Sequence, residues 1–209
     1  MPLFKTIDVN SQTNVKIWKI EESYDDLYNL VALREESIVR VSNMKSEIHQ
    51  RGFLSIRMLL KEFGYQDFDL YYDEIGRPHL KDGKHISITH SFNFSAIAIS
   101  DAVVGIDIEK QRDKIKLIAH KFIDYEWDYL DETSANYVQE LTLLWCVKES
   151  LYKLCKTPGL SFKNHCLVIP FSTNENISTA WVDYNNCKSK YEVHALEFEG
   201  FTCAYALGQ

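Results

Sequence analysis

A long helical pattern followed by several short strand-like runs occurs twice along this chain. The first helical pattern covers about 43–63 and ends at Gly64, and the second covers about 134–156. The strand-like runs lie at 68–72, 85–89 and 94–100 in the first half, and at 166–169, 180–184, 191–198 and 201–207 in the second. This order predicts an α+β protein of two similar halves, 1–104 and 105–209, that form an intramolecular pseudo-dimer with the active site at their interface.

The composition supports a folded core and speaks against two classes of partner. Of the 209 residues, 45% are hydrophobic and 25% charged, which is typical of globular proteins. Acidic residues outnumber basic ones by 30 to 23, the opposite of the balance expected for a nucleic-acid-binding protein. Residues 1–5 do not resemble a signal peptide and no apolar run is long enough to span a membrane. The five cysteines form no CxxC pair, which predicts reduced thiols and a cytoplasmic location, and the pseudo-dimer predicts a monomer.

Two acidic side chains are predicted to share one face of a strand near the middle of the chain. Within 103–110, residues alternate between apolar and acidic from Ile106 to Glu109. Because residues i and i+2 of a strand share a face, Asp107 and Glu109 point the same way. Neighbouring carboxylates repel unless a cation lies between them, and Mg²⁺ takes one or two carboxylates together with phosphate oxygens and water. The spacing also suits an edge strand with two solvated acids, so it leaves both interpretations open.

A lysine lies on the apolar stripe of the second helical pattern. Lys148 falls in line with Leu144 and Leu151, where another apolar residue is expected. A lysine at such a position costs free energy unless it is paired or its ammonium group reaches water. It therefore either extends to solvent at the helix edge or contacts a phosphate or carboxylate in a cleft. In the same helix, Glu149 and Lys153 are four residues apart and face the same way.

Two short segments of the first half carry residues that suit phosphate binding. Gly76, Arg77 and Pro78 predict a rigid turn that presents a guanidinium group. His90 follows Thr89 at a predicted strand end, where it can donate hydrogen bonds to a phosphate. A plain turn and a structural histidine also explain these segments when each is taken alone.

Together and in this order, the clusters resemble the 4′-phosphopantetheinyl transferases, specifically the surfactin-synthetase-activating (Sfp) type. The motifs are Gly-Arg-Pro at 76–78, Thr-His-Ser at 89–91, Gly-Ile-Asp-Ile-Glu at 105–109 and Trp-Cys-Val-Lys-Glu-Ser-Leu-Tyr-Lys at 145–153. The resemblance covers roughly 50–159 and implies a monomer of two similar α+β halves. It also implies transfer of the phosphopantetheine arm of coenzyme A to a serine of an acyl, peptidyl or aryl carrier protein, with adenosine 3′,5′-bisphosphate as the second product.

The resemblance assigns roles to individual residues. Asp107, Glu109 and Glu149 would hold Mg²⁺, with Mn²⁺ as the alternative, at the pyrophosphate of coenzyme A. Glu149 is the first candidate for the base that takes the serine proton, and Lys148 is the rival. Lys153 would bind a phosphate oxygen and stabilise the charge of the transition state.

In the first half, the resemblance implies contacts to the rest of coenzyme A. Gly76, Arg77 and Pro78 would form the loop at the adenine, Arg51 and His90 the clamp on the 3′-phosphate, and Thr89 a support for the phosphates. Three positions depart from the family pattern: Cys146 replaces a small hydroxyl residue, Arg77 a frequent lysine and Thr89 a frequent serine. The basic cluster expected before Arg51 is thin, so the 3′-phosphate contacts are less well defined than the metal site.

A basic segment directly follows the acidic strand. Carrier proteins are acidic, so we expect them to dock on a locally positive face, although such a segment is also compatible with an ordinary solvated surface. Within 110–121 a single acid, Asp113, stands against five basic residues: Lys110, Arg112, Lys114, Lys116 and Lys121.

Two other functions remain to be distinguished from transfer. A coenzyme A-binding module without catalysis would share the fold, but all three metal carboxylates are present. A Mg²⁺-dependent phosphodiesterase or nuclease could use the same carboxylates, but the acidic composition and the lack of a basic groove with interleaved aromatic residues speak against it. The sequence does not choose among fatty acid, polyketide and peptide synthetase carriers.

Overall fold

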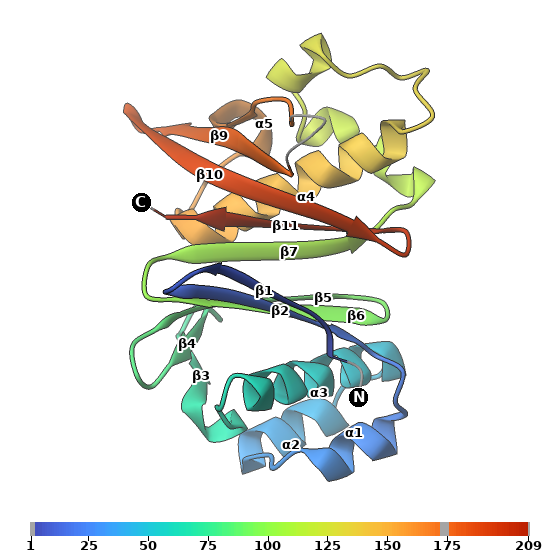
Figure 1. Cartoon of the computed structure of the whole chain (residues 1–209), viewed down its shortest axis with the longest axis vertical. Helices are drawn as coiled ribbons and strands as arrows, with labels where there is room; N and C mark the ends of the chain where they lie inside the picture. Colours follow the sequence, from blue (N-terminus) through green and yellow to red (C-terminus); the bar gives the residue numbers. More distant parts are fainter. Residues whose placement is uncertain (1–2, 172–175, 209) are drawn as a thin grey trace. The chain divides into compact units, whose positions relative to one another are not determined.

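The computed structural model describes residues 3–171 and 176–208, and it is a mixed α+β structure with antiparallel sheets, which confirms the predicted class. The chain divides into two compact units, Met1–Ala102 and Val103–Gln209, whereas the sequence analysis sets the boundary after residue 104. Figure 1 follows the chain through both units. Within the described ranges, no helix has both the length and the apolar character needed to cross a lipid bilayer.

The N-terminal unit is built on a four-stranded antiparallel sheet in the order β1-β2-β6-β5. Its strands are β1 (Leu3–Asn10), β2 (Thr13–Lys19), β5 (His85–Ser91) and β6 (Phe94–Ser100). β5 and β6 are predicted from the sequence pattern, whereas the first two strands are not. β2 buries Val15 and Ile17 at alternate positions, whereas the edge strand β1 is mostly exposed and so lacks the buried alternation that identifies a strand in a sequence.

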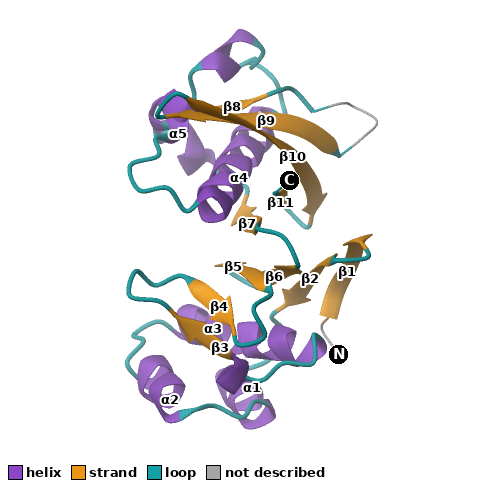
Figure 2. Ribbon diagram, turned by 90° about the vertical axis from the view of Figure 1, so that its left-hand side faces the viewer, coloured by secondary structure: helices purple, strands orange, loops and turns teal. Residues whose placement is uncertain are grey.

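Three helices complete this unit: α1 (Tyr24–Leu30), α2 (Glu35–Ser42) and α3 (Glu47–Glu62). α3 packs against β2, β5 and β6, and the other two helices pack against α3, as Figure 2 shows for this unit. The predicted helix over 43–63 corresponds to α3, which is followed by Gly64 in the left-handed conformation (φ +84°), a common way to end a helix. The strand predicted at 68–72 begins instead as a 3₁₀ turn, and only β3 (Leu70–Tyr72) pairs with β4 (Pro78–Leu80).

The C-terminal unit contains a five-stranded antiparallel sheet in the order β7-β11-β10-β9-β8. Its strands are β7 (Val104–Lys110), β8 (Cys166–Val168), β9 (Ile177–Tyr184), β10 (Cys187–Phe198) and β11 (Phe201–Leu207). The long helix α4 (Tyr137–Cys155) packs against β7 and β11, and the short helix α5 (Phe162–His165) follows it. Three 3₁₀ turns connect β7 to α4: Asp113–Leu117, Ala119–Lys121 and Tyr125–Asp128.

Each unit has its own apolar core between its sheet and its long helix. Fully buried side chains include Trp18 and Leu59 in the N-terminal unit, and Phe122, Val147 and Leu151 in the C-terminal unit. In both units the strand that precedes the helices pairs with the last strand, β2 with β6 and β7 with β11, and the long helix packs on that pair. β7 and α4, which carry the most specific sequence motifs, are therefore in direct contact. The predicted pseudo-dimer stays a prediction.

Candidate active site

β7 presents its two acids on the face that α4 covers. Ile106 and Ile108 are fully buried, Asp107 is 5% exposed and Glu109 is partly exposed. A methyl group placed on Gly105 would touch Ser150 of α4, so Gly105 and the residues that alternate with it, Asp107 and Glu109, face the helix. The predicted strand and the shared face of the two acids follow from this alternation.

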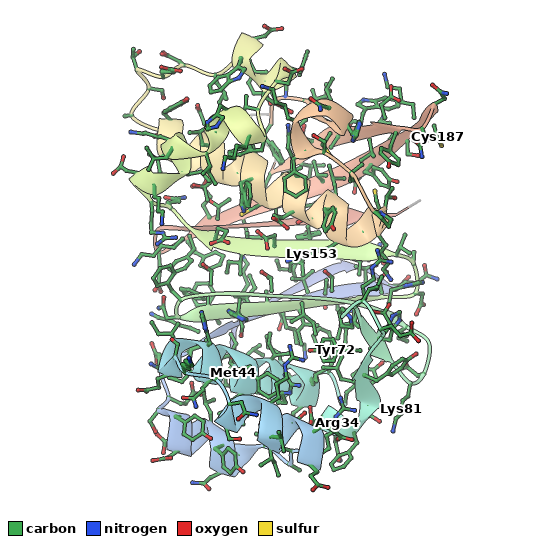
Figure 3. The ribbon with its side chains drawn as sticks, turned by 180° about the vertical axis from the view of Figure 1, so that it is seen from behind. Arg34, Met44, Tyr72, Lys81, Lys153 and Cys187 are labelled. Atoms are coloured by element: carbon green, nitrogen blue, oxygen red, sulfur yellow. The ribbon has the colours of Figure 1, made fainter. Side chains whose placement is uncertain are left out.

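α4 places one acidic and one basic side chain, Glu149 and Lys153, next to the two acids of β7. The Nζ atom of Lys153 donates to Asp107 Oδ1 at 2.8 Å and to the carbonyl oxygen of Ile106 at 2.8 Å. Figure 3 labels Lys153 at this junction between α4 and β7. Glu149, one turn earlier on the helix, has its pKa raised from 4.5 to about 7, chiefly because it is buried and next because of the nearby charge of Asp107. Glu109 raises this pKa as well, and Lys153 opposes the rise, so all four side chains belong to one electrostatic cluster.

Lys148 contacts a carboxylate, which is one of the two alternatives that the sequence left open, but that carboxylate lies in the buried interior of the unit and not in a cleft. Its side chain is fully buried and both carboxylate oxygens of Glu126 lie 2.8 Å from Nζ. Nζ also donates to the carbonyl oxygens of Phe122 (2.7 Å) and Phe162 (3.3 Å). Burial lowers the pKa of Lys148, and the charge of Glu126 acts against that shift.

This geometry favours Glu149 over Lys148 as the base. An ammonium group has three protons, and here each has a partner inside the unit, so no lone pair or free donor faces a substrate. Glu126 is a residue that the sequence analysis does not identify. It is fully buried on the 3₁₀ turn Tyr125–Asp128 and also accepts from the backbone N–H of Val168 at 2.9 Å. Because Glu126 lies 22 residues before Lys148, no helical or strand spacing in the sequence connects them.

In the N-terminal unit, the structure brings His90 against the helix that carries Arg51. The ring of His90 packs on α3 at Gly52, where an added methyl group would lie 3.2 Å from the ring. His49 lies close by, with 6.2 Å between the two ring centroids. Nη2 of Arg51 donates to the carbonyl oxygen of Ile20 at 3.2 Å, while its Nε is buried and has no hydrogen-bond partner among the described residues. Thr89 precedes His90 and is buried.

Gly76 and Arg77 lie in the connection between β3 and β4, and Pro78 is the first residue of β4. Gly76 has φ +80°, a left-handed conformation that glycine adopts without strain. Asp73, which the sequence analysis does not identify, closes the turn: its Oδ1 accepts from the backbone N–H of Arg77 at 2.8 Å. Its backbone N–H donates to the carbonyl oxygen of Arg77 at 3.0 Å. The hydrogen bond from Arg77 is the main reason that the pKa of Asp73 is lowered.

The basic segment 110–121 is exposed along most of its length. Leu117 at the end of its first 3₁₀ turn is 71% exposed, and Lys116 contacts Asp113 at 2.9 Å. The five basic residues named in the sequence analysis are all exposed. The segment therefore presents a positively charged surface with one large apolar side chain.

The side-chain chemistry of the β7–α4 cluster fits a hard divalent cation. Across the described ranges, no three histidine, cysteine, aspartate or glutamate side chains converge into a ready-made metal cage. Mg²⁺ does not require one, because it usually binds through one or two carboxylates together with substrate phosphates and water. Burial is the largest cause of the raised pKa of Glu149, and the nearby charges of Asp107 and Glu109 raise it further. A cation between these side chains would relieve that repulsion.

Comparison with known proteins identifies the class to which this fold and cluster belong. Residues 103–206 match the family model of the 4′-phosphopantetheinyl transferase superfamily, and this range includes both β7 and α4. The chain is also 27% identical over 183 residues to the 4′-phosphopantetheinyl transferase gsp of Aneurinibacillus migulanus, covering 84% of this chain and 75% of that protein. The chain belongs to the 4′-phosphopantetheinyl transferase superfamily and is a transferase, which confirms the resemblance seen in the sequence.

Proposed function

We propose that this enzyme transfers the 4′-phosphopantetheine arm of coenzyme A to a serine of an apo carrier protein. The observation that carries the proposal is the contact of β7 with α4, which places Asp107, Glu109, Glu149 and Lys153 in one cluster. The serine hydroxyl forms a bond to the β-phosphorus of coenzyme A, and the bond from that phosphorus to the bridging oxygen breaks. Adenosine 3′,5′-bisphosphate leaves with the bridging oxygen, and the serine loses its proton.

Glu149 is the residue that suits proton removal. Glu149 lies in the cluster one turn before Lys153, and in the metal-free protein burial and like charges raise its pKa to about 7; a bound cation would lower that pKa and favour the carboxylate, which is the form that can accept a proton. Asp107, Glu109 and Glu149 would hold Mg²⁺, or Mn²⁺ in its place, and the ion would neutralise charge on the pyrophosphate. Lys153 supplies a positive charge next to Asp107 and would hold a phosphate oxygen.

Residues of the N-terminal unit would bind the remainder of coenzyme A. Arg51 and His90 are proposed to contact the 3′-phosphate, supported by the packing of His90 on α3 beside Arg51 and by the unused Nε of Arg51. Thr89 would support the phosphates, and the segment 76–78 at the start of β4 would lie at the adenine. A buried guanidinium N–H without a partner favours an anionic ligand because such a donor costs free energy when it stays unpaired.

The basic segment 110–121 is proposed as the docking surface for the acidic carrier. Its exposed lysines attract negative charge, and Leu117 offers an apolar anchor within the same surface. We further propose that the enzyme acts as a monomer in the cytoplasm. The identity of the carrier, whether of fatty acid, polyketide or peptide synthesis, is left to the assay.

Intact-protein mass spectrometry tests this function directly. Apo carrier proteins are incubated with the enzyme, coenzyme A and Mg²⁺, and a parallel sample contains a chelator. We expect the carrier to gain one phosphopantetheine group, and to gain none in the chelator sample. The Asp107→Asn variant should lose at least about 99% of the transfer rate because it removes a charge from the cluster. Glu140→Gln, on the same helix but nine residues before Glu149, is the matched control and should keep the rate.

Each failure has a distinct meaning. Coenzyme A binding without transfer to any of several carriers would favour a non-catalytic binding module. Absence of coenzyme A binding would contradict the proposed substrate. Transfer that continues in the chelator sample would contradict the proposed metal.

A further inference from the structure

The backbones of β7 and α4 come into contact at Gly105. A methyl group on Gly105 would overlap the carbonyl oxygen of Ser150, and it would lie 2.8 Å from the carbonyl carbon of Ser150 and 3.1 Å from Cβ of Leu154. The first two are main-chain atoms, which no rotamer change can move away. Non-bonded carbon atoms prefer about 3.5–4.0 Å. Helix and strand are therefore as close as they can be only because residue 105 has no side chain.

Ser150 fixes the same turn of the helix to the neighbouring strand. It is fully buried, and its Oγ lies 2.9 Å from the carbonyl oxygen of Ala204 on β11 and 2.7 Å from that of Cys146 one turn earlier on α4. Ala204 stands opposite Asp107 in the β7–β11 pairing. The helix turn at Ser150 is thus held by two adjacent strands, through a close contact on one and a hydrogen bond on the other.

This contact lies between the acids that the proposed function requires. Ser150 is the residue after Glu149, and Gly105 lies two positions before Asp107 on the same face of β7. One turn further along α4, Lys153 reaches Asp107 Oδ1. Any movement of the helix away from Gly105 would therefore separate Glu149 from Asp107.

We propose that Gly105 is a positioning residue for the metal carboxylates: its missing side chain lets α4 approach β7 closely enough for Glu149, Asp107 and Glu109 to share one small cation. The inference rests on the proposed function, because it concerns the same metal site. A methyl group at 105 would force the helix outward by about 0.7 Å or more, the difference between 2.8 Å and an ordinary carbon contact. Mg²⁺ demands oxygen atoms at about 2.0–2.1 Å in near-octahedral geometry, whereas Ca²⁺ accepts about 2.3–2.6 Å in flexible arrangements.

The test compares Gly105→Ala with Gly208→Ala. A methyl group on Gly208 would likewise overlap a neighbour, the Val103 side chain, and would lie 2.8 Å from the Val103 carbonyl oxygen. Val103 directly precedes β7 and Gly208 directly follows β11, so none of the atoms in this clash belongs to α4. The control therefore introduces a similar steric strain into the same unit without moving the helix away from Asp107.

Metal binding is measured on the whole protein with coenzyme A present, from the electron paramagnetic resonance signal of free Mn²⁺, which is then displaced with Mg²⁺ or Ca²⁺. For Gly105→Ala we expect Mg²⁺ to bind about tenfold or more weakly, and Ca²⁺ to lose less, so that the preference shifts toward the larger ion. Gly208→Ala should keep the wild-type affinities for Mg²⁺ and Ca²⁺ and the wild-type preference between them, even if its melting temperature falls by as much as that of Gly105→Ala.

A gentler variant covers the case in which Gly105→Ala does not fold. Ser150→Thr adds one methyl group to the fully buried side chain by which this turn of α4 contacts β11, and it should weaken Mg²⁺ binding in the same direction by a smaller factor. Wild-type Mg²⁺ affinity in either folded variant, or equal weakening in Gly208→Ala, would overturn the positioning role alone. A wild-type protein that binds no Mn²⁺ with coenzyme A would overturn the proposed metal site and this inference with it.

Discussion

Replacing Lys148 by methionine removes an ammonium group that the C-terminal unit encloses completely. The substitution keeps an unbranched side chain that is one heavy atom shorter, but it leaves Glu126 charged and buried and removes the donor from the carbonyl oxygens of Phe122 and Phe162. Breaking a buried ion pair by removing one partner costs about 3–5 kcal/mol, because the remaining charge is uncompensated. A whole domain is stable by about 5–15 kcal/mol, so we expect a large share of the unfolding free energy to disappear.

Urea unfolding of a double-mutant cycle measures this energy. The variants are Lys148→Met, Glu126→Gln and the two combined. Each single change should cost about 3–5 kcal/mol, and the combination should cost at least about 2 kcal/mol less than the sum, because it leaves no unpaired charge. A Lys148→Met variant within 1 kcal/mol of the wild type, or costs that simply add, would refute the argument that this pair holds α4 in place.

The same variants decide whether Lys148 acts chemically. Turnover is measured per folded molecule at a temperature where both single variants are folded. A purely structural ion pair predicts similar losses for Lys148→Met and Glu126→Gln, because each disturbs the same contact. A base at Lys148 predicts that Lys148→Met abolishes transfer while Glu126→Gln retains much of it.

Three further predictions concern charge. Because the pKa of Glu149 rises from 4.5 to about 7 on folding, the metal-free protein should lose stability as pH increases through this range. Glu149→Gln should abolish that loss and raise the melting temperature in chelator at pH 8. The same variant should nevertheless eliminate transfer. Calorimetric titration of Arg51→Gln and His90→Gln should show about tenfold weaker binding of coenzyme A but unchanged binding of dephospho-coenzyme A, which lacks the 3′-phosphate. Reversing Lys114 and Lys116 to glutamate should raise KM for the carrier about tenfold, most at low salt, without changing KM for coenzyme A; an equal effect on both substrates would contradict the docking surface.

Local patterns in the sequence were sufficient to predict most of the regular elements. α4 and the strands β5, β6 and β8–β11 are identified by apolar spacing because each buries a continuous stripe or face. β1 is not predicted because an exposed edge strand has no buried face and therefore no alternation of apolar residues in its sequence. α2 escapes because it is only eight residues long and buries little besides Val41.

The same distinction applies to the site. Asp107 with Glu109, and Glu149 with Lys153, are predictable as pairs because each pair lies on one element and follows its period. Contacts between elements were not predictable: the environment of Lys148 stays open in the sequence because its partner Glu126 lies on a 3₁₀ turn with no periodic relation to α4. A regular spacing along one element can show which residues share a face, but only the packed structure shows which faces meet.

The charges of the β7–α4 cluster explain why the proposed metal and coenzyme A would bind together. With all acids ionised, Asp107, Glu109 and Glu149 carry three negative charges and Lys153 one positive, which leaves an excess of two among these four side chains. A divalent cation compensates for that excess, but Lys153 already holds Asp107 Oδ1 at 2.8 Å. The pyrophosphate of coenzyme A offers Lys153 another anionic partner and offers the cation further oxygen ligands. We therefore expect each of the two to raise the affinity for the other, and equal Mn²⁺ affinity with and without coenzyme A would contradict this coupling.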